Sequence, residues 1–381
     1  MTEAQLTLSD QVEGCPHPKL TETLYGHEAQ EKEFIDCYKS GKLHHGWLIT
    51  GVRGIGKATL AWRLARFILT QPIKSCYENS LFGETSKQKH TELDDKSKES
   101  IETRIIAESE PRLSVTRRSF DEKKKKFRSN IRVDEIRRLN SFFSLSVSDG
   151  GSRVAIIDCV DDLNINAANA LLKVLEEPPK ETFFLLISHN PESLLETLRS
   201  RCRELRLTNL SENNLLSALK QINLNLPEKD KEIYSLLASG SVGNSIRLLK
   251  HDGANLYSSI LTFLNELPNL KGFELEKFVS TFEGTKNRDR LELFLELLNI
   301  AIARISKSGV LGANFTDQAL KGENDIFRKL CPNPNIAKKW AELAQTQSKK
   351  LSHGLSVNLD PGSLILDTFF RIEDCAKTIR Q

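Results

Sequence analysis

Short apolar runs alternate with helix-spaced apolar residues over the first 208 residues of the chain. The runs, which are typical of buried strands, are GWLITG at 46–51, RVAIID at 153–158, TFFLLIS at 182–188 and RELRL at 203–207. Apolar residues three or four positions apart predict helices at 28–38, 58–70, 132–145, 167–177 and about 191–198. Asn164 or Asn166 is placed to cap the fourth of these helices, and Pro178 ends it. This alternation predicts an α/β fold, a parallel sheet with helices on both faces.

The stretch from 72 to 130 interrupts the alternation. Residues 85–110 are rich in Lys, Glu, Ser, Asp and Thr and hold few large apolar side chains. Because such a composition buries too little surface to offset the entropy of ordering, we expect a variable, partly flexible insertion. Regular structure is expected to resume near Ile131.

No strand pattern follows Thr208. Helix-length patterns run over 211–222, 228–240 and 241–251, and the rest of the chain from about Leu256 to Gln381 is also helical in pattern. We therefore expect three parts: a core at 1–208, a small helical unit at 209–252, and an all-helical domain at 253–381. A chain of 381 residues is long enough for two or three domains at roughly 150 residues each.

Composition narrows the function classes. Lys and Arg total 54 against 51 for Asp and Glu, so the net charge is only +3 and the chain is not uniformly basic. One basic strip, Lys123–Lys126 with Arg117, Arg118 and Arg128, is a candidate for contact with DNA phosphates. The simpler interpretation of that strip is a solvated surface.

The seven cysteines are widely spaced, odd in number and never in a C-x-x-C pair, which indicates reduced thiols in a cytoplasmic protein. The N-terminus is polar and the apolar runs are too short to cross a bilayer, so neither a signal peptide nor a membrane span is expected. Cys76 and His90 are isolated within 72–130, so no zinc site is expected there.

The segment GVRGIGKAT, residues 51–59, predicts a phosphate-binding loop. Gly51, Gly56 and Lys57 fit G-x-x-x-x-G-K, and Gly54 adds a third glycine between an apolar run and a helix. Such glycines let backbone N–H groups face phosphate oxygens, and the lysine bridges the outer phosphates. The usual hydroxyl for Mg²⁺ is missing, since Ala58 follows the lysine and Thr59 comes one residue later.

The segment VAIIDCVDD, residues 154–162, carries a second part of such a site. An apolar strand that ends in Asp158 is typical of the carboxylate that positions Mg²⁺. Cys159 stands where hydrolysing ring ATPases usually carry a water-activating Glu. Asp161 and Asp162 follow, and their simpler interpretation is a solvated loop or a helix cap.

Three segments together resemble the clamp-loader branch of the AAA+ ATPases. They are HHGWLITGVRGIGKATLA, RVAIIDCVDDLNINAANALLKVLEEPP and ISHNPESLLETLRSRCRELRL. Within that branch, the resemblance is greatest to the delta-prime subunits of bacterial DNA polymerase III. It covers roughly 20–250 and implies an AAA+ core with a helical lid, followed by a collar-type oligomerisation domain.

The resemblance assigns further roles. Arg201 of the SRC motif corresponds to an arginine that acts in trans on the ATP of a neighbouring subunit, and Ser188 corresponds to a polar sensor of nucleotide or water. Gly243 stands where active members carry a lid arginine, and Arg247 lies one helical turn further on. Because Ala58, Cys159 and Gly243 all depart from the active pattern, weak binding of ATP or ADP without turnover is expected, with Mg²⁺ binding doubtful.

The function implied is that of a stator subunit in a hetero-oligomer with clamp-loader ATPase subunits and a delta subunit. Through that complex it helps to load the sliding clamp on primed DNA during replication, although the chain shows no polymerase site of its own. Two alternatives stay open. One is a catalytically active motor ATPase of the same family, and the other is a small-molecule kinase, for which the helical C-terminal third offers no acceptor site.

Overall fold

The computed structural model describes residues 8–12, 15–21, 23–71, 92–123, 126–144, 151–224, 226, 231–282, 288–356 and 359–380. By its contacts the chain divides into two compact units. The first is Met1–Leu224 with Ser241–Gly243, and the second is Asn225–Gly240 with Asn244–Gln381. Each unit is described by itself.

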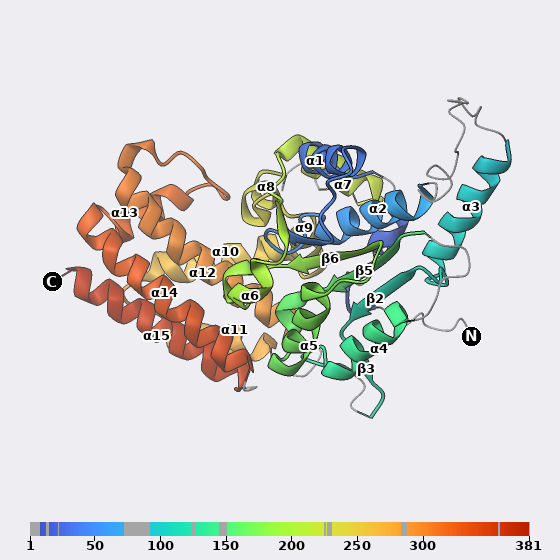
Figure 1. Cartoon of the computed structure of the whole chain (residues 1–381). Helices are drawn as coiled ribbons and strands as arrows, with labels where there is room; N and C mark the ends of the chain where they lie inside the picture. The colour runs from blue at the N-terminus through green and yellow to red at the C-terminus, as the bar shows by residue number, and fades with distance from the viewer. Residues whose placement is uncertain are drawn as a thin grey trace, which may run out of the picture. The chain divides into compact units, whose positions relative to one another are not determined.

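A five-stranded parallel sheet organises the first unit, in the order β2-β5-β6-β1-β7 (Figure 1). Its strands are β1 (Gly46–Thr50), β2 (Leu113–Arg117), β5 (Arg153–Asp158), β6 (Thr182–Ser188) and β7 (Arg203–Arg206). All four neighbouring pairs run parallel, so the carboxyl ends of the strands share one edge of the sheet. The predicted parallel αβα class is confirmed.

Helices cover both faces of this sheet, as Figure 1 shows. Successive side chains of a strand point to opposite faces, so Trp47 and Ile49 pack in one core while Leu48 packs in the other. The first core also takes side chains from α1 (Glu28–Lys39), α2 (Lys57–Thr70) and α3 (Glu92–Ile106). The second core takes side chains from α4 (Val133–Ser144) and α5 (Ile165–Glu176).

The expectation that regular structure resumes only near Ile131 is wrong. Helix α3 and strand β2 precede that residue, and a small hairpin of β3 (Phe120–Asp121) and β4 (Lys126–Phe127) follows β2. The composition predicted too little regular structure here, because a few apolar side chains are enough to attach a helix and an edge strand to the core. Ile105 is fully buried, and Leu113 and Val115 of the edge strand pack on the same core. Residues 72–91 and 124–125, including Cys76 and His90, lie outside the described residues.

Two local expectations are resolved between β5 and β7. Asn164 is the N-cap of α5, and its side-chain oxygen accepts a hydrogen bond from Ala167 N at 2.8 Å. The single helix expected at 191–198 is instead a 3₁₀ turn, Pro191–Ser193, and a short α6 (Glu196–Arg199). Leu194 between them has extended backbone, which breaks the helix.

The rest of the described chain is helical, as predicted. The helices are α7 (Glu212–Gln221), α8 (Lys231–Ala238), α9 (Val242–Lys250), α10 (Gly253–Glu266), α11 (Gly272–Val279), α12 (Arg288–Leu311), α13 (Glu323–Leu330), α14 (Pro334–Ser356) and α15 (Pro361–Arg380). Among the described residues, no helix is long and apolar enough to span a membrane. The domain boundaries at 208 and 252 stay predictions.

The buried carboxylate of Glu323 links three helices of the second unit. It accepts hydrogen bonds from Tyr257 Oη at 2.6 Å and from Arg304 Nε at 2.9 Å. The side chain of Glu323 is 0% exposed, so these partners replace the water that a carboxylate normally requires. The contact ties α13 to α10 and α12.

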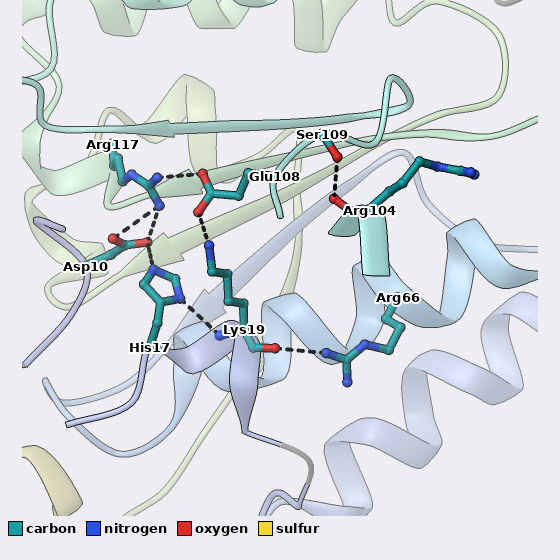
Figure 2. Close-up of polar contacts among 8 residues, drawn as sticks. All are labelled: Asp10, His17, Lys19, Arg66, Arg104, Glu108, Ser109 and Arg117. Atoms are coloured by element: carbon teal, nitrogen blue, oxygen red, sulfur yellow. Dashed lines mark hydrogen bonds and ion pairs between the residues drawn. The ribbon is translucent and has the colours of Figure 1, made fainter. Parts of the chain in front are cut away.

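A polar network fastens the N-terminal segment to the sheet (Figure 2). Asp10 Oδ2 accepts hydrogen bonds from Arg117 at 3.0 Å and from His17 at 3.1 Å. On its other side Arg117 donates to Glu108 at 2.6 Å, and Glu108 also accepts from Lys19 at 2.7 Å. Burial alone raises the pKa of Asp10, but the hydrogen bonds from His17 and Arg117 outweigh it and hold that pKa below its usual value. The charged form of this buried group is therefore stabilised by the fold.

We predict that Asp10→Asn lowers the free energy of unfolding by about 1.5–3 kcal/mol, because charge-assisted hydrogen bonds to a buried group are lost. Asp134→Asn is the matched control, since the side chain of Asp134 is 67% exposed and its ion pair with Arg137 lies within one helix. That control should change stability by no more than about 0.5 kcal/mol. Thermal and urea unfolding of the intact chain measure both variants, and equal losses would contradict the importance of the network.

Candidate functional site

The predicted phosphate-binding loop lies between β1 and α2. Gly54 and Gly56 have φ values of 79° and 106°, which side-chain-bearing residues rarely adopt. Gly56 is also the N-cap of α2, so the loop delivers the chain directly into the helix N-terminus. The backbone thus has the form that favours a bound anion at this point.

Lys57 is turned onto its own loop. Its Nζ donates to Gly51 O at 2.7 Å and to Val52 O at 2.6 Å, and the residue is 3% exposed. Burial lowers the pKa of Lys57 to about 8, although the negative charge of Asp158 acts in the opposite direction. The ammonium that would hold phosphates is therefore satisfied by the loop itself. Ala58 packs against the core beside it and supplies no hydroxyl.

Asp158 and Ser188 come together at the carboxyl edge of the sheet. Asp158 is the last residue of β5 and pairs in register with Ile187 of β6, next to Ser188. Ser188 is fully buried and donates through Oγ to Asp161 Oδ1 at 2.9 Å. The hydroxyl expected to act as a sensor is thus engaged by a carboxylate of the same chain.

Asp161 has a structural role that the sequence did not indicate. Besides Ser188, it accepts hydrogen bonds from the backbone N of His189 at 2.7 Å and of Asn190 at 3.1 Å. It therefore fastens the loop after β5 to the end of β6, and the interpretation of a solvated loop or helix cap does not describe it. Asp162 forms an ion pair with Arg118 at 3.1 Å.

The groups at this edge have strongly shifted pKa values. Burial, reinforced by nearby carboxylates, raises the pKa of Asp158 to about 7. Burial, again with the neighbouring carboxylates of Asp162 and Asp161, raises the pKa of the Cys159 thiol well above its usual range. Burial, with the positive charge of Lys57, lowers the pKa of His189 to about 4. Each group is held toward its neutral form.

The segment 241–243 packs directly against the phosphate-binding loop. Ser241 Oγ donates to Arg53 O at 2.8 Å, and Gly243 N donates to Gly54 O at 3.0 Å. A Cβ on Gly243 would lie 2.8 Å from the Cα of Gly54, closer than such atoms approach. Gly243 therefore does more than omit a lid arginine, because its missing side chain is what permits this contact.

Arg247 is engaged within the second unit. Its guanidinium donates to both carboxylate oxygens of Glu296, at 2.9 Å and 3.2 Å. This two-point ion pair gives Arg247 a structural partner of its own on α12.

Arg201 lies at the opposite edge of the sheet from Lys57. It precedes the first residue of β7, whereas Lys57 follows the loop at the end of β1, and the two strands run parallel. The five residues of β1 alone span about 16 Å at roughly 3.3 Å per residue. Arg201 Nη2 pairs with Glu176 Oε1 at 2.7 Å, and Nη1 donates to Thr197 O at 2.9 Å. The guanidinium is thus held at the surface, away from its own chain's phosphate-binding loop.

The basic strip is balanced by local carboxylates. Besides the pairs that Arg117 and Arg118 make, Arg128 pairs with Asp121 at 3.4 Å. Phe120 and Phe127 meet edge to face across the hairpin, with ring centroids 5.3 Å apart. Direct contact of 117–128 with DNA stays a prediction, and these internal ion pairs weigh against it.

Sequence reasoning missed three residues of this site: Asp161, His189 and Ser241. A signal existed for the first two, because polar residues directly after buried parallel strands meet at one edge of a sheet. No signal existed for Ser241, whose acceptor lies 188 positions earlier in the chain.

This chain is similar to proteins of a known family. A family model described as "DNA polymerase III, delta subunit" matches residues 26–211. The "DNA polymerase III subunit gamma" of Buchnera aphidicola subsp. Schizaphis graminum is 30% identical over 280 residues, which are 71% of this chain and 69% of that protein.

Two relatives are delta-prime subunits. The "DNA polymerase III subunit delta'" of Pseudomonas aeruginosa is 35% identical over 42% of this chain and 41% of that protein. The protein of the same name from Escherichia coli K12 is 29% identical over 58% of this chain and 59% of that protein. The match thus spans about half the length of these two relatives.

Two solved structures are similar at a lower level. A DNA polymerase III gamma-subunit-related protein of Thermotoga maritima has a TM-score of 0.36 and 14% identity, over 92% of this chain and 99% of that one. The RuvB branch-migration motor of the same organism has a TM-score of 0.37 and 15% identity, over 82% of this chain and 91% of that one.

We predict that Gly243→Ala loosens segment 241–243 from the phosphate-binding loop, because the new methyl group collides with Gly54. Overpacking of this kind costs about 1–3 kcal/mol of stability. Titration with a fluorescent ADP analogue should then show tighter binding, since the contact no longer restrains the loop. Gly272→Ala is the matched control, as a Cβ there meets nothing within 4 Å. Unchanged ADP affinity in Gly243→Ala would show that the contact does not limit nucleotide binding.

We also predict a pH-dependent effect of Asp158→Asn. Between pH 3.8, the ordinary pKa of an aspartate, and about pH 7, its pKa in the fold, Asp158 keeps a proton in the folded chain that the unfolded chain releases. Its contribution to stability therefore falls as pH rises through this window, and the loss amounts to up to about 4 kcal/mol at 1.36 kcal/mol per pKa unit. Relative to the natural chain, the variant should gain stability as pH rises from about 4 to about 7, measured by thermal unfolding. His189 makes stability depend on pH in the opposite direction, but it is present in both proteins and its effect cancels in the stability difference between them. A stability difference that does not change with pH would contradict the burial of Asp158.

Proposed function

We propose, from the premise that this chain belongs to the DNA polymerase III clamp-loader family of replication proteins, that it is a delta-prime-type stator subunit. In this role it carries a nucleotide site that does not turn over, and it completes the ATP site of a neighbouring subunit. Its partners are then clamp-loader ATPase subunits and a delta subunit, and through them the sliding clamp and primed DNA. We propose that this complex acts in the cytoplasm.

The contact of Gly243 with Gly54 is the observation that carries the non-hydrolysing part of the proposal. It packs the chain against the loop that would hold the phosphates, while Lys57 Nζ is hydrogen-bonded to carbonyls of that loop. Cys159 supplies no water-activating carboxylate, and such a group contributes about 10²–10⁴ to a rate. Weak binding of ATP or ADP, with little Mg²⁺, is consistent with this arrangement.

The position of Arg201 supports action in trans. The length of the paired strands β1 and β7 separates it from Lys57 of its own chain, so a nucleotide phosphate that Arg201 contacts would belong to another molecule. Its ion pair with Glu176 presents the planar guanidinium at the surface, with 34% of the side chain exposed. A planar cation with several donors suits the charge that spreads over a transferring phosphoryl group.

The second candidate is an active motor ATPase of the same family. The relative with the longest coverage given above is a gamma subunit, which is the specific observation in its favour. The two candidates differ in one simple assay: steady ATP hydrolysis by the purified chain alone, abolished by Lys57→Ala, would establish the motor and overturn the stator.

Arg201→Ala in a reconstituted clamp loader tests the proposed role in trans. Turnover at the one ATP site that Arg201 completes should fall by about 10³ or more, while the remaining sites continue, so total ATPase and clamp loading both drop. Arg199→Ala is the matched control, because Arg199 is an exposed arginine two residues away at the end of α6. Native mass measurement shows that each variant still assembles. Unchanged ATPase and loading rates in an assembled Arg201→Ala complex would overturn the proposed role of this arginine.

A further inference from the structure

We propose that Asp158, Cys159 and His189 form a binding site for one divalent transition-metal cation of the Zn²⁺ class. Each side chain offers one ligand atom, and the three atoms all lie within 4.8 Å of one another. Zinc bonds to N, O and S ligands are about 2.0–2.3 Å long, which places tetrahedral ligands about 3.5 Å apart. Small side-chain movements therefore bring the three atoms onto one cation. This inference stands independently of the proposed function.

The backbone places these ligands with little freedom. Asp158 ends β5 and Cys159 follows it, while His189 directly follows β6, and the two strands are paired in register up to Asp158 and Ile187. Asp161 accepts hydrogen bonds from the backbone N of His189 and from Ser188 Oγ, so it fixes the chain on which His189 stands. Groups that orient metal ligands in this way strengthen binding.

His189 supplies an observation that points to a ligand. Its Nδ1 is buried and has no hydrogen-bond partner within the part of the chain that the structure describes. A buried nitrogen without a partner is unfavourable, and metal coordination is one of the ways in which an imidazole nitrogen is satisfied.

The chemistry of the three ligands selects the cation. Mg²⁺ prefers an octahedral shell of oxygen atoms, which a thiol and an imidazole do not provide. Sulfur, nitrogen and oxygen together suit Zn²⁺ or Co²⁺, and the thiol releases its proton when it binds. Three protein ligands leave the fourth tetrahedral position to a water molecule.

The charges around the site are of both signs. The ligands Asp158 and Cys159 carry two negative charges when the cation is bound, and Asp161 and Asp162 lie within electrostatic reach of Cys159. Lys57, Arg53 and Arg118 lie within electrostatic reach of His189 and oppose binding. The Nζ of Lys57 is hydrogen-bonded to Gly51 O and Val52 O, so the carbonyls of the loop take up part of its charge.

Titration of the full chain with Co²⁺ alone, in reducing and chelator-free buffer, tests the proposal. We expect one equivalent to bind with a near-ultraviolet sulfur-to-cobalt charge-transfer band, and Zn²⁺ to displace it, because a tetrahedral site with a thiolate ligand favours Zn²⁺ over Co²⁺. Cys159→Ser should lose the band. His189→Ala and the orienting variant Asp161→Asn should weaken binding by at least about 10-fold.

Cys375→Ser is the control for sulfur, since Cys375 is a half-buried free thiol on α15, outside the proposed site. Its band and affinity should equal those of the natural chain. Thermal unfolding with and without Zn²⁺ gives a second readout, and bound metal should raise the Tm of the natural chain and of Cys375→Ser but not of Cys159→Ser. A band that persists in Cys159→Ser, or no saturable band in the natural chain, overturns the proposal.

Discussion

The parallel pairing of β5, β6 and β1 is the constraint on which the rest of the first unit depends. Because the three strands are buried on both faces and locked in register, their carboxyl ends fall at one edge of the sheet. That edge gathers the loop before α2, the carboxyl group of Asp158 and the end of β6. Each group's burial follows from this position, and burial is the first cause of the shifted pKa values of Lys57, Asp158 and His189.

Several contacts within the chain together hold the loop and the neighbouring strand ends in one closed arrangement. Gly243 lets the chain approach the loop, Lys57 is satisfied by loop carbonyls, and Asp161 engages the hydroxyl of Ser188. Two polar groups that would meet a nucleotide, Lys57 Nζ and Ser188 Oγ, thus have partners within the chain. Opening the site therefore requires several of these contacts to be exchanged together, which is consistent with the rigid subunit proposed above.

The sequence predicted the parts of the site that follow local rules. The strands before Gly51, Asp158 and Ser188 are continuous apolar runs, and the loop carries its glycines where positive φ values occur. Strand β2 was missed because an edge strand needs few apolar residues, and Leu113 and Val115 alternate with polar ones. The role of Gly243 was beyond reach, because its reason is a backbone contact with Gly54, far away in the chain.

If Arg201 acts on a neighbouring subunit as proposed, its position opposite Lys57 determines how copies of this fold can be joined. A subunit with an arginine at one end of its sheet and a phosphate-binding loop at the other makes a head-to-tail contact between two different surfaces. Such contacts have no two-fold axis. They build rings or open rows with a direction. In such an assembly, a subunit whose phosphate-binding loop is occupied by contacts within its own chain would stand at one end of the series of hydrolysing nucleotide sites. Direction and a defined terminus would then both follow from the length of one five-residue strand.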